Sequence, residues 1–179
     1  QGVIFNKIAS NNGLNPVLLG KKYKFKSAST NIEESINDND ANTIIIATRH
    51  NSHCDYILKA LEANKNIFVE KPLCICKKEL ELIESKYISL INNQAKTERI
   101  RLMIGFNRRF APLTLKLRQI ISKINSPIVF NYTINAGLLP SDHWLQNPKI
   151  GGGRLIGEAV HFVDLLRFLS KSQIESMKI

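Results

Sequence analysis

The sequence places a lysine directly after a short apolar stretch. Residues 66–69 are predicted to form a strand, and Glu70, Lys71 and Pro72 follow it without a spacer. Charged side chains are rarely buried unless they are paired or used, so either the strand surfaces here or Lys71 is held at the mouth of a site. Pro72 stiffens the turn and is the residue type that allows a cis peptide bond before it. A lysine held in this way can donate a hydrogen bond to a substrate hydroxyl and stabilise an oxyanion.

A histidine towards the end of the sequence also has two interpretations. The predicted helix 155–169 is apolar on nearly all sides and is therefore expected to be buried. Arg154, Glu158 and His161 nevertheless share one narrow face of it, and Asp164 lies at the edge of that face. This stripe either packs one domain on another through salt bridges and hydrogen bonds, or it belongs to a reaction centre. In the second case His161 is a natural proton acceptor for an alcohol.

Polar residues follow three predicted strands at the points where the strands end. These polar segments are 48–53, 70–72 and 107–109. Parallel α/β sheets bind ligands outside the carboxyl ends of their strands, so we expect the three segments to lie along one edge of a sheet. Their convergence predicts a functional site more strongly than any one of them does.

A metal site is not predicted. His50, His53 and Cys54 could meet on one helical turn, but a metal site needs further ligands and no matching pair is visible. We expect instead an exposed helix start whose backbone N–H groups and His53 face a ligand or solvent. The cysteines include no Cys-x-x-Cys pair, which favours free thiols in a reducing cytoplasm.

The elements that must position these residues alternate between strand and helix. This order predicts an α/β fold with a mostly parallel sheet and crossover helices. Past Ser126–Pro127 the pattern changes, because residues 128–136 alternate as a strand with two different faces does. We therefore place a domain boundary near Asn125, giving domains 1–125 and 126–179. The predicted strands are 3–9, 43–48 (covered on both faces), 66–69 and 102–106, and the predicted helices are 16–22, one starting after Asn51 or Ser52, 78–91, 112–124 and 155–169.

Composition excludes some classes of function. The net charge of +10 could serve nucleic-acid binding, but the basic residues are scattered without interleaved aromatics, so we predict no nucleic-acid partner. The charge can equally attract an anionic cofactor or substrate. No apolar run is long enough for a membrane span, and we predict no membrane partner.

Several short motifs occur in an order that resembles one family. They are Thr48-Arg49-His50 with His53, Glu70-Lys71-Pro72, Gly105-Phe106-Asn107-Arg108-Arg109-Phe110 with Pro112, Trp144, and Gly151-Gly152-Gly153 with His161 and Asp164. Each motif alone is weak, but together they are similar to the Gfo/Idh/MocA oxidoreductases over nearly the entire chain. The Gly-Phe-Asn-Arg-Arg-Phe-x-Pro form resembles a branch found in bacterial surface-polysaccharide gene clusters.

The resemblance implies a fold, a reaction and a set of site residues. Residues 1–125 would be part of a Rossmann-like dinucleotide-binding domain, and residues 126–179 would begin a substrate and oligomerisation domain with an open sheet. The expected reaction is hydride transfer between NAD or NADP and a sugar-like or cyclitol hydroxyl, in a possible homo-oligomer. Lys71 would position the hydroxyl and His161 would act as acid or base. The implied cofactor contacts are Ser10, Thr48, His50, His53, Glu70, Lys71 and Asn107, and the implied substrate contacts are Arg108, Trp144, Arg154, Glu158 and Asp164.

The sequence departs from the family pattern in two respects. A Gly-x-Gly-x-x-Gly loop is absent, and the strand ending at Ser10 resembles the second strand of the family fold, so we expect the chain to be truncated at both ends and inactive by itself. Many members also carry Asp four residues before the histidine, where this chain has Gly157, with Glu158 adjacent. This second departure supports an alternative, a non-catalytic binding or regulatory protein that retains the fold.

Overall fold

The strands of this protein run parallel and end on the same side. In the computed structural model, which describes residues 2–11, 14–93 and 100–178, β1 (Lys7–Ala9) pairs with β2 (Ser27–Ser29) in one sheet. β3 (Thr43–Ile46), β4 (Asn66–Val69) and β5 (Leu102–Ile104) form a second sheet in that order. The α/β class and the parallel pairing are therefore as predicted, and β4 has the predicted limits.

Two helices cover one face of the three-stranded sheet. α3 (His53–Glu62) and α4 (Lys77–Asn93) pack on Ile67 and Val69, which are almost completely buried. The opposite face is open, because Ile45 in β3 and Met103 in β5 are 61% and 46% exposed. The prediction that the strand 43–48 is covered on both faces is therefore wrong for the described residues. A run of β-branched residues shows that a strand is apolar, but it does not show which layer covers each face.

A short strand and a short helix that the sequence did not predict precede β3. α1 (Leu14–Tyr23) connects β1 to β2, and α2 (Ile32–Ile36) follows β2. The side chain of Asn31 caps α2 by accepting a hydrogen bond from the Glu34 amide at 3.0 Å. β2 consists of small polar residues with little strand signal, so its pairing with β1 defines it.

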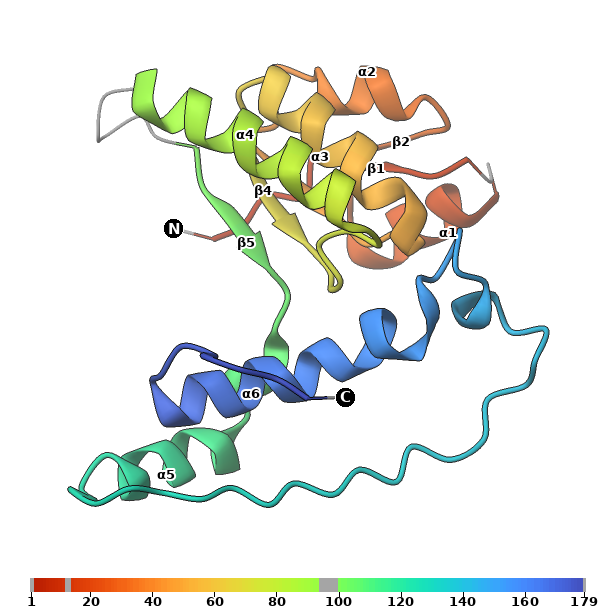
Figure 1. Ribbon diagram of the computed structural model, residues 1–179. Helices are drawn as coiled ribbons and strands as arrows, with labels where there is room; N and C mark the ends of the chain where they lie inside the picture. The colour runs from red at the N-terminus through yellow and green to blue at the C-terminus, as the bar shows by residue number, and fades with distance from the viewer. Residues whose placement is uncertain (1, 12–13, 94–99, 179) are drawn as a thin grey trace.

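The later part of the chain forms a second layer below the strand ends (Figure 1). It contains α5 (Pro112–Ile121) and α6 (Val160–Ser170), with a π-helical turn at Leu155–Ala159 leading into α6. The arrowheads of β4 and β5 point towards this layer. No helix in the described part of the chain is long and apolar enough to cross a membrane.

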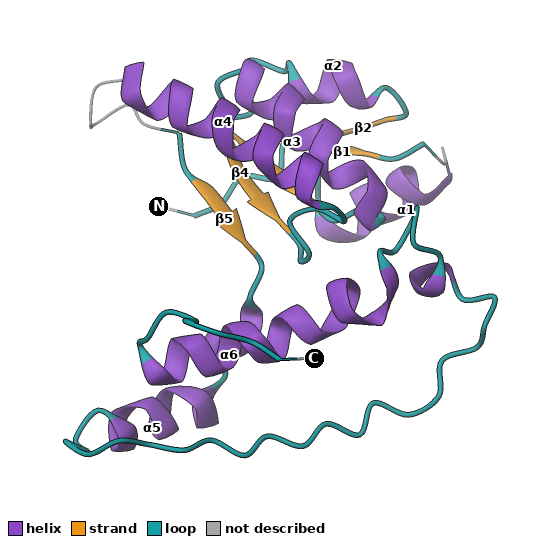
Figure 2. Cartoon of the chain, in the orientation of Figure 1, coloured by secondary structure: helices purple, strands orange, loops and turns teal. Residues whose placement is uncertain are grey.

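The expected open sheet of the second domain is not formed by the described residues. Residues 128–136 run as an extended loop without a neighbouring strand, and residues 172–178 are also loop (Figure 2). Alternation decides which side chains share a face, but a strand exists only when another strand satisfies its N–H and C=O groups. The boundary near residue 125 stays a prediction, because α5 before it packs against α6 after it through Arg118 and Phe168.

Candidate active site

The segment from Gly151 to Asp164 contacts the carboxyl ends of all three strands of the larger sheet. His50 follows β3, and its Nδ1 lies 2.8 Å from the carbonyl oxygen of Gly151. Lys71, which follows β4, donates from Nζ to the carbonyl oxygen of Gly157 at 2.6 Å. Arg109, which follows β5, donates from Nε to Asp164 Oδ2 at 2.7 Å. The predicted convergence of the three polar segments is thus present in the structure.

Lys71 is half-buried against the π-helical turn. The peptide bond between Lys71 and Pro72 is cis. Burial lowers the pKa of the Lys71 ammonium, while the carboxylates of Glu158 and Glu70 oppose this effect. The contact with the Gly157 carbonyl uses one of the three ammonium donors, so further donors remain for a ligand oxygen.

His161 lies one helical turn after Gly157 and is therefore close to Lys71. Its Nδ1 is buried and has no hydrogen-bond partner among the described residues. Burial lowers the pKa of His161, and the charges of Lys71 and Arg108 lower it further. The ring is consequently neutral at neutral pH and able to accept a proton from a ligand hydroxyl. The neighbouring Lys71 ammonium can donate a hydrogen bond to the oxygen of that hydroxyl.

Glu70 and Gly105 come into close contact across the ends of β4 and β5. A Cβ at Gly105 would lie 3.0 Å from Glu70 Oε2, so the absence of a side chain at Gly105 provides space for the Glu70 carboxylate. The Glu70 amide donates to the carbonyl of Ile46 at 2.9 Å, which continues the pairing with β3. Glu70 is thereby held at the sheet edge beside Lys71.

Two histidines hold turns in place at the end of β3. His50 packs edge-on against the ring of Trp144, with centroids 4.8 Å apart. His53 is fully buried, with Nδ1 2.7 Å from the Pro72 carbonyl and Nε2 3.1 Å from the Thr48 carbonyl. Both ring nitrogens thus face backbone oxygens. His53 is thus not an exposed helix-start residue, and it ties the turn after β4 to the turn after β3.

The remaining predicted cofactor residues lie at strand ends in two different sheets. Thr48 Oγ1 is 2.7 Å from Ser52 Oγ at the exposed end of β3. Asn107 begins a short 3₁₀ turn after β5, with its amide bonded to the Gly105 carbonyl at 2.8 Å. Ser10 follows β1 and therefore belongs to the two-stranded sheet, where its amide donates to the Ser29 carbonyl at 3.2 Å.

The predicted substrate residues are distributed along the second layer. Asp164 is buried and both of its carboxylate oxygens are held by Arg109. Arg154 donates to the carbonyls of Ala136 and Gly137, which anchors the extended loop. Glu158 is only 4.0 Å from Arg154 and is partly exposed.

The other two predicted substrate residues, Arg108 and Trp144, make contacts with aromatic rings. The guanidinium of Arg108 lies 4.7 Å from the centroid of Phe162. Trp144 stacks with His50, and the Arg49 guanidinium lies 5.6 Å from its ring. Sequence reasoning missed Arg109 as the partner of Asp164, although the charges are opposite, because the residues are far apart in the chain.

Gly157 has a role that the sequence did not indicate. A Cβ at this position would lie 2.3 Å from Leu145 Cδ1 and 3.2 Å from His50 Cε1, so the structure has no space for a side chain here. The backbone carbonyl of Gly157, and not a side chain at this position, contacts Lys71. The Glu158 carboxylate acts on Lys71 through its charge, whereas the Lys71 ammonium donates its hydrogen bond to Gly157.

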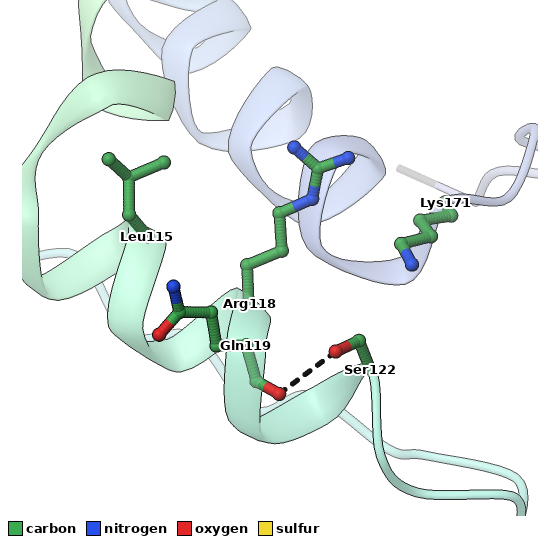
Figure 3. Close-up of a pocket in the computed structure, with 5 residues that line it drawn as sticks. All are labelled: Leu115, Arg118, Gln119, Ser122 and Lys171. Carbon is green, nitrogen blue, oxygen red and sulfur yellow. Dashed lines mark hydrogen bonds between the residues drawn. The ribbon is translucent and has the colours of Figure 1, made fainter.

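Other candidate sites in the described residues are weaker. The residues that the structure describes contain no cluster of His, Cys, Asp or Glu that could hold a metal ion. A pocket of about 400 Å³ lies between α5 and the end of α6 and is lined by Leu115, Arg118, Gln119, Ser122 and Lys171 (Figure 3). None of these residues belongs to the strand ends, so the pocket is separate from the Lys71–His161 site.

Comparison with known proteins shows the family of the chain. Residues 8–88 match the sequence model of the Gfo/Idh/MocA family, which is described as an oxidoreductase family with an NAD-binding Rossmann fold. The scyllo-inositol 2-dehydrogenase (NAD(+)) of Bacillus subtilis is 33% identical over 147 residues, covering 80% of this chain and 40% of the relative. The chain belongs to the Gfo/Idh/MocA family.

Further members and solved structures support the family assignment. The inositol 2-dehydrogenase of Pseudarthrobacter chlorophenolicus is 30% identical over 158 residues, covering 85% of this chain and 42% of the relative. An oxidoreductase domain protein from Kribbella flavida superposes with a TM-score of 0.76 at 20% identity, over 96% of this chain and 46% of that protein. A levoglucosan dehydrogenase in complex with NADH and levoglucosan gives 0.72 at 22% identity, over 93% and 45%. The chain thus spans less than half the length of these Gfo/Idh/MocA proteins, and the structural likeness concerns the fold.

Proposed function

We propose that the protein is an NAD(P)-dependent oxidoreductase that transfers a hydride between the nicotinamide and a hydroxyl-bearing carbon of a sugar-like or cyclitol substrate. One observation carries the proposal: the Lys71 ammonium and the neutral His161 ring lie together at the carboxyl ends of β3, β4 and β5. Membership of an oxidoreductase family and inositol dehydrogenase relatives support the substrate class.

The residues of this chain would handle the hydroxyl proton. Lys71 Nζ, held by the Gly157 carbonyl, donates a hydrogen bond to the substrate oxygen and stabilises negative charge on it. The neutral His161 ring accepts the proton of the hydroxyl when the alcohol is oxidised and returns it in the reverse direction. Removing this proton makes the carbon a better hydride donor.

The strand ends fit the nicotinamide part of a dinucleotide. Thr48, Glu70 and Asn107 follow three neighbouring parallel strands, at the sheet edge where α/β sheets bind ligands. The sequence has no Gly-x-Gly-x-x-Gly loop, so its residues do not provide the usual pyrophosphate cradle. When bound, the cofactor supplies the acceptor or donor of the hydride. Ser10, which is not acidic, leaves both NAD and NADP as candidates.

The wider assignments are also proposals. A role in surface-polysaccharide synthesis depends on the resemblance of the 105–112 motif. A cytoplasmic location is supported by the free thiols of Cys54, Cys74 and Cys76. Homo-oligomerisation is supported by the exposed apolar side chains of the second layer, such as Leu113, Val129 and Leu138.

The decisive experiment compares two lysine variants of the whole protein. With a panel of inositols, sugars and nucleotide sugars, and with NAD or NADP, the absorbance of the reduced nicotinamide measures turnover. Lys71→Ala should lower kcat by roughly 10²–10⁴-fold, as expected for the loss of a proton-handling group, and leave cofactor binding measured by fluorescence largely intact. Lys59→Ala is the matched control, because Lys59 pairs with Asp55 on the exposed side of α3. Equal turnover of the Lys71 variant and wild type would refute the assignment.

A non-catalytic protein is the second candidate. Gly157 favours it, because this position lacks the carboxylate that many family members carry. Cofactor binding without turnover on the whole panel would support this alternative.

A further inference from the structure

Arg109 and Asp164 form the ion pair whose carboxylate is the most buried among the described ion pairs, and they connect the two layers of the molecule. Asp164 is 7% exposed in its side chain and Arg109 37%. Arg109 donates from Nε to Oδ2 at 2.7 Å and from Nη2 to Oδ1, so one planar guanidinium holds both carboxylate oxygens. Its pKa is raised chiefly by the hydrogen bonds to Asp164. Such a two-point contact fixes the direction of the carboxylate as well as its charge.

Two aromatic rings also lie close to the Arg109 guanidinium. Arg109 lies 5.5 Å from the centroid of Phe106, which precedes it after β5, and 5.7 Å from that of Phe168 in α6. Phe106 also contacts the His161 ring edge-on, at a centroid distance of 6.3 Å. The polar and aromatic contacts of Arg109 therefore lead from the end of β5 to the helix that carries His161.

Asp164 lies three residues after His161 and hence on the same side of α6. The charged groups that act on the His161 ring come from three elements. Lys71 after β4 and Arg108 after β5 act to keep the ring neutral, whereas Asp164 and Glu158 on its own segment favour the protonated ring. Of the two carboxylates that favour the protonated ring, Asp164 is the buried one.

We propose that Arg109 is a positioning residue for the site: by holding both oxygens of Asp164, it directs this carboxylate away from the His161 ring and keeps the ring available as a proton acceptor. The role of His161 in this inference depends on the proposed function, but the effect of the ion pair on the ring does not require turnover. Without Arg109, the Asp164 carboxylate would be free to favour the imidazolium.

The test is a titration of the His161 ring by NMR in the unliganded protein. Four histidines are present, and the His161 signal is identified by its loss in His161→Asn. Arg109→Gln frees the Asp164 carboxylate, so we expect the pKa of His161 to rise. Asp164→Asn removes that carboxylate and leaves Arg109 unpaired, so we expect the pKa of His161 to fall. Opposite shifts from two variants that break the same ion pair are the expected result.

A merely structural role gives a different result. If breaking the pair only loosened α6, solvent would reach His161 in both variants, and its pKa would rise in both because burial lowers it in the native protein. Shifts in the same direction, or no shift in either, would therefore overturn the proposal. Arg109→Lys retains the charge but not the two-point contact, and we expect it to lie between wild type and Arg109→Gln.

A control variant separates stacking from the ion pair. Arg118 also stacks on Phe168, at 4.0 Å, but forms no ion pair in the described structure. Arg118→Gln should leave the titration of His161 unchanged. If the whole protein fails to turn over any substrate while the opposite shifts are observed, the proposed function fails and the positioning role of Arg109 stands.

Discussion

Lys71 Nζ and the carbonyl oxygen of Gly157 are 2.6 Å apart, although 86 positions separate the residues in the chain. The contact joins the turn after β4 to the π-helical turn that precedes α6. It also places the ammonium one helical turn from His161. Gly157, which has no side chain, thus holds the Lys71 ammonium through its backbone carbonyl.

We expect Gly157→Ala to destabilise the protein by roughly 1–3 kcal/mol, the usual cost of inserting a methyl group into a filled space. The new Cβ would lie 2.3 Å from Cδ1 of the buried Leu145 side chain, so that side chain must shift within its packed surroundings. Urea unfolding measures the change. Gly20→Ala is the matched control: its Cβ would lie 3.4 Å from Ile8 Cγ2, an ordinary contact, and alanine is favoured within α1. Equal stability of the two alanine variants would contradict the steric argument.

His53→Ala should cost about 2–4 kcal/mol, because it removes a fully buried ring and leaves the carbonyls of Thr48 and Pro72 without this partner. Lys59→Ala on the same helix removes only an exposed ion pair and should have a much smaller effect, because solvent screens such pairs. Chemical denaturation of both variants checks the difference. A small effect at His53 would show that its two carbonyl contacts contribute little.

Stability should decrease as the pH falls below about 6.5, the ordinary pKa of histidine. Burial lowers the pKa of both His50 and His161 in the folded state. The unfolded chain therefore takes up protons at a higher pH than the native protein does, and the stability contributed by the neutral rings is complete above the unfolded pKa and lost below it. Urea midpoints between about pH 7.5 and 5.5 measure this slope. The double variant His50→Gln/His161→Gln should flatten it, and an unchanged slope would assign the pH dependence to other groups.

The three thiols should react with a thiol reagent in the order of their exposure. Cys76 is exposed, Cys74 is half-buried and Cys54 is buried. Burial raises the pKa of Cys74 to about 11, so only about one thiol in a thousand is the reactive thiolate at pH 8. We expect one fast phase, which Cys76→Ser removes, and modification of Cys54 only on unfolding. A fast phase that persists in Cys76→Ser would show that the α3–α4 junction opens readily.

Much of the first layer could be predicted from local patterns. The apolar run 66–69 followed by Glu70 and Lys71 matches β4 and its polar end, because a strand limit depends on neighbouring residues. The segment 128–136 shows the limit of this reasoning. Its alternation is that of a strand, but no strand pairs with it in the described structure.

The sequence alone determined the family, the order of strands and helices from β3 to β5, and the residue types at the strand ends, because these follow from short-range periodicity and from ordered motifs. Only the tertiary structure decided what each polar group contacts. His53 holds two backbone carbonyls, Asp164 holds Arg109, and Lys71 holds Gly157. Apart from Thr48, which lies close to His53 in the chain, these partners are 19 to 86 positions away. A side chain acquires such partners only when packing brings separate segments together and excludes the water that would otherwise satisfy it.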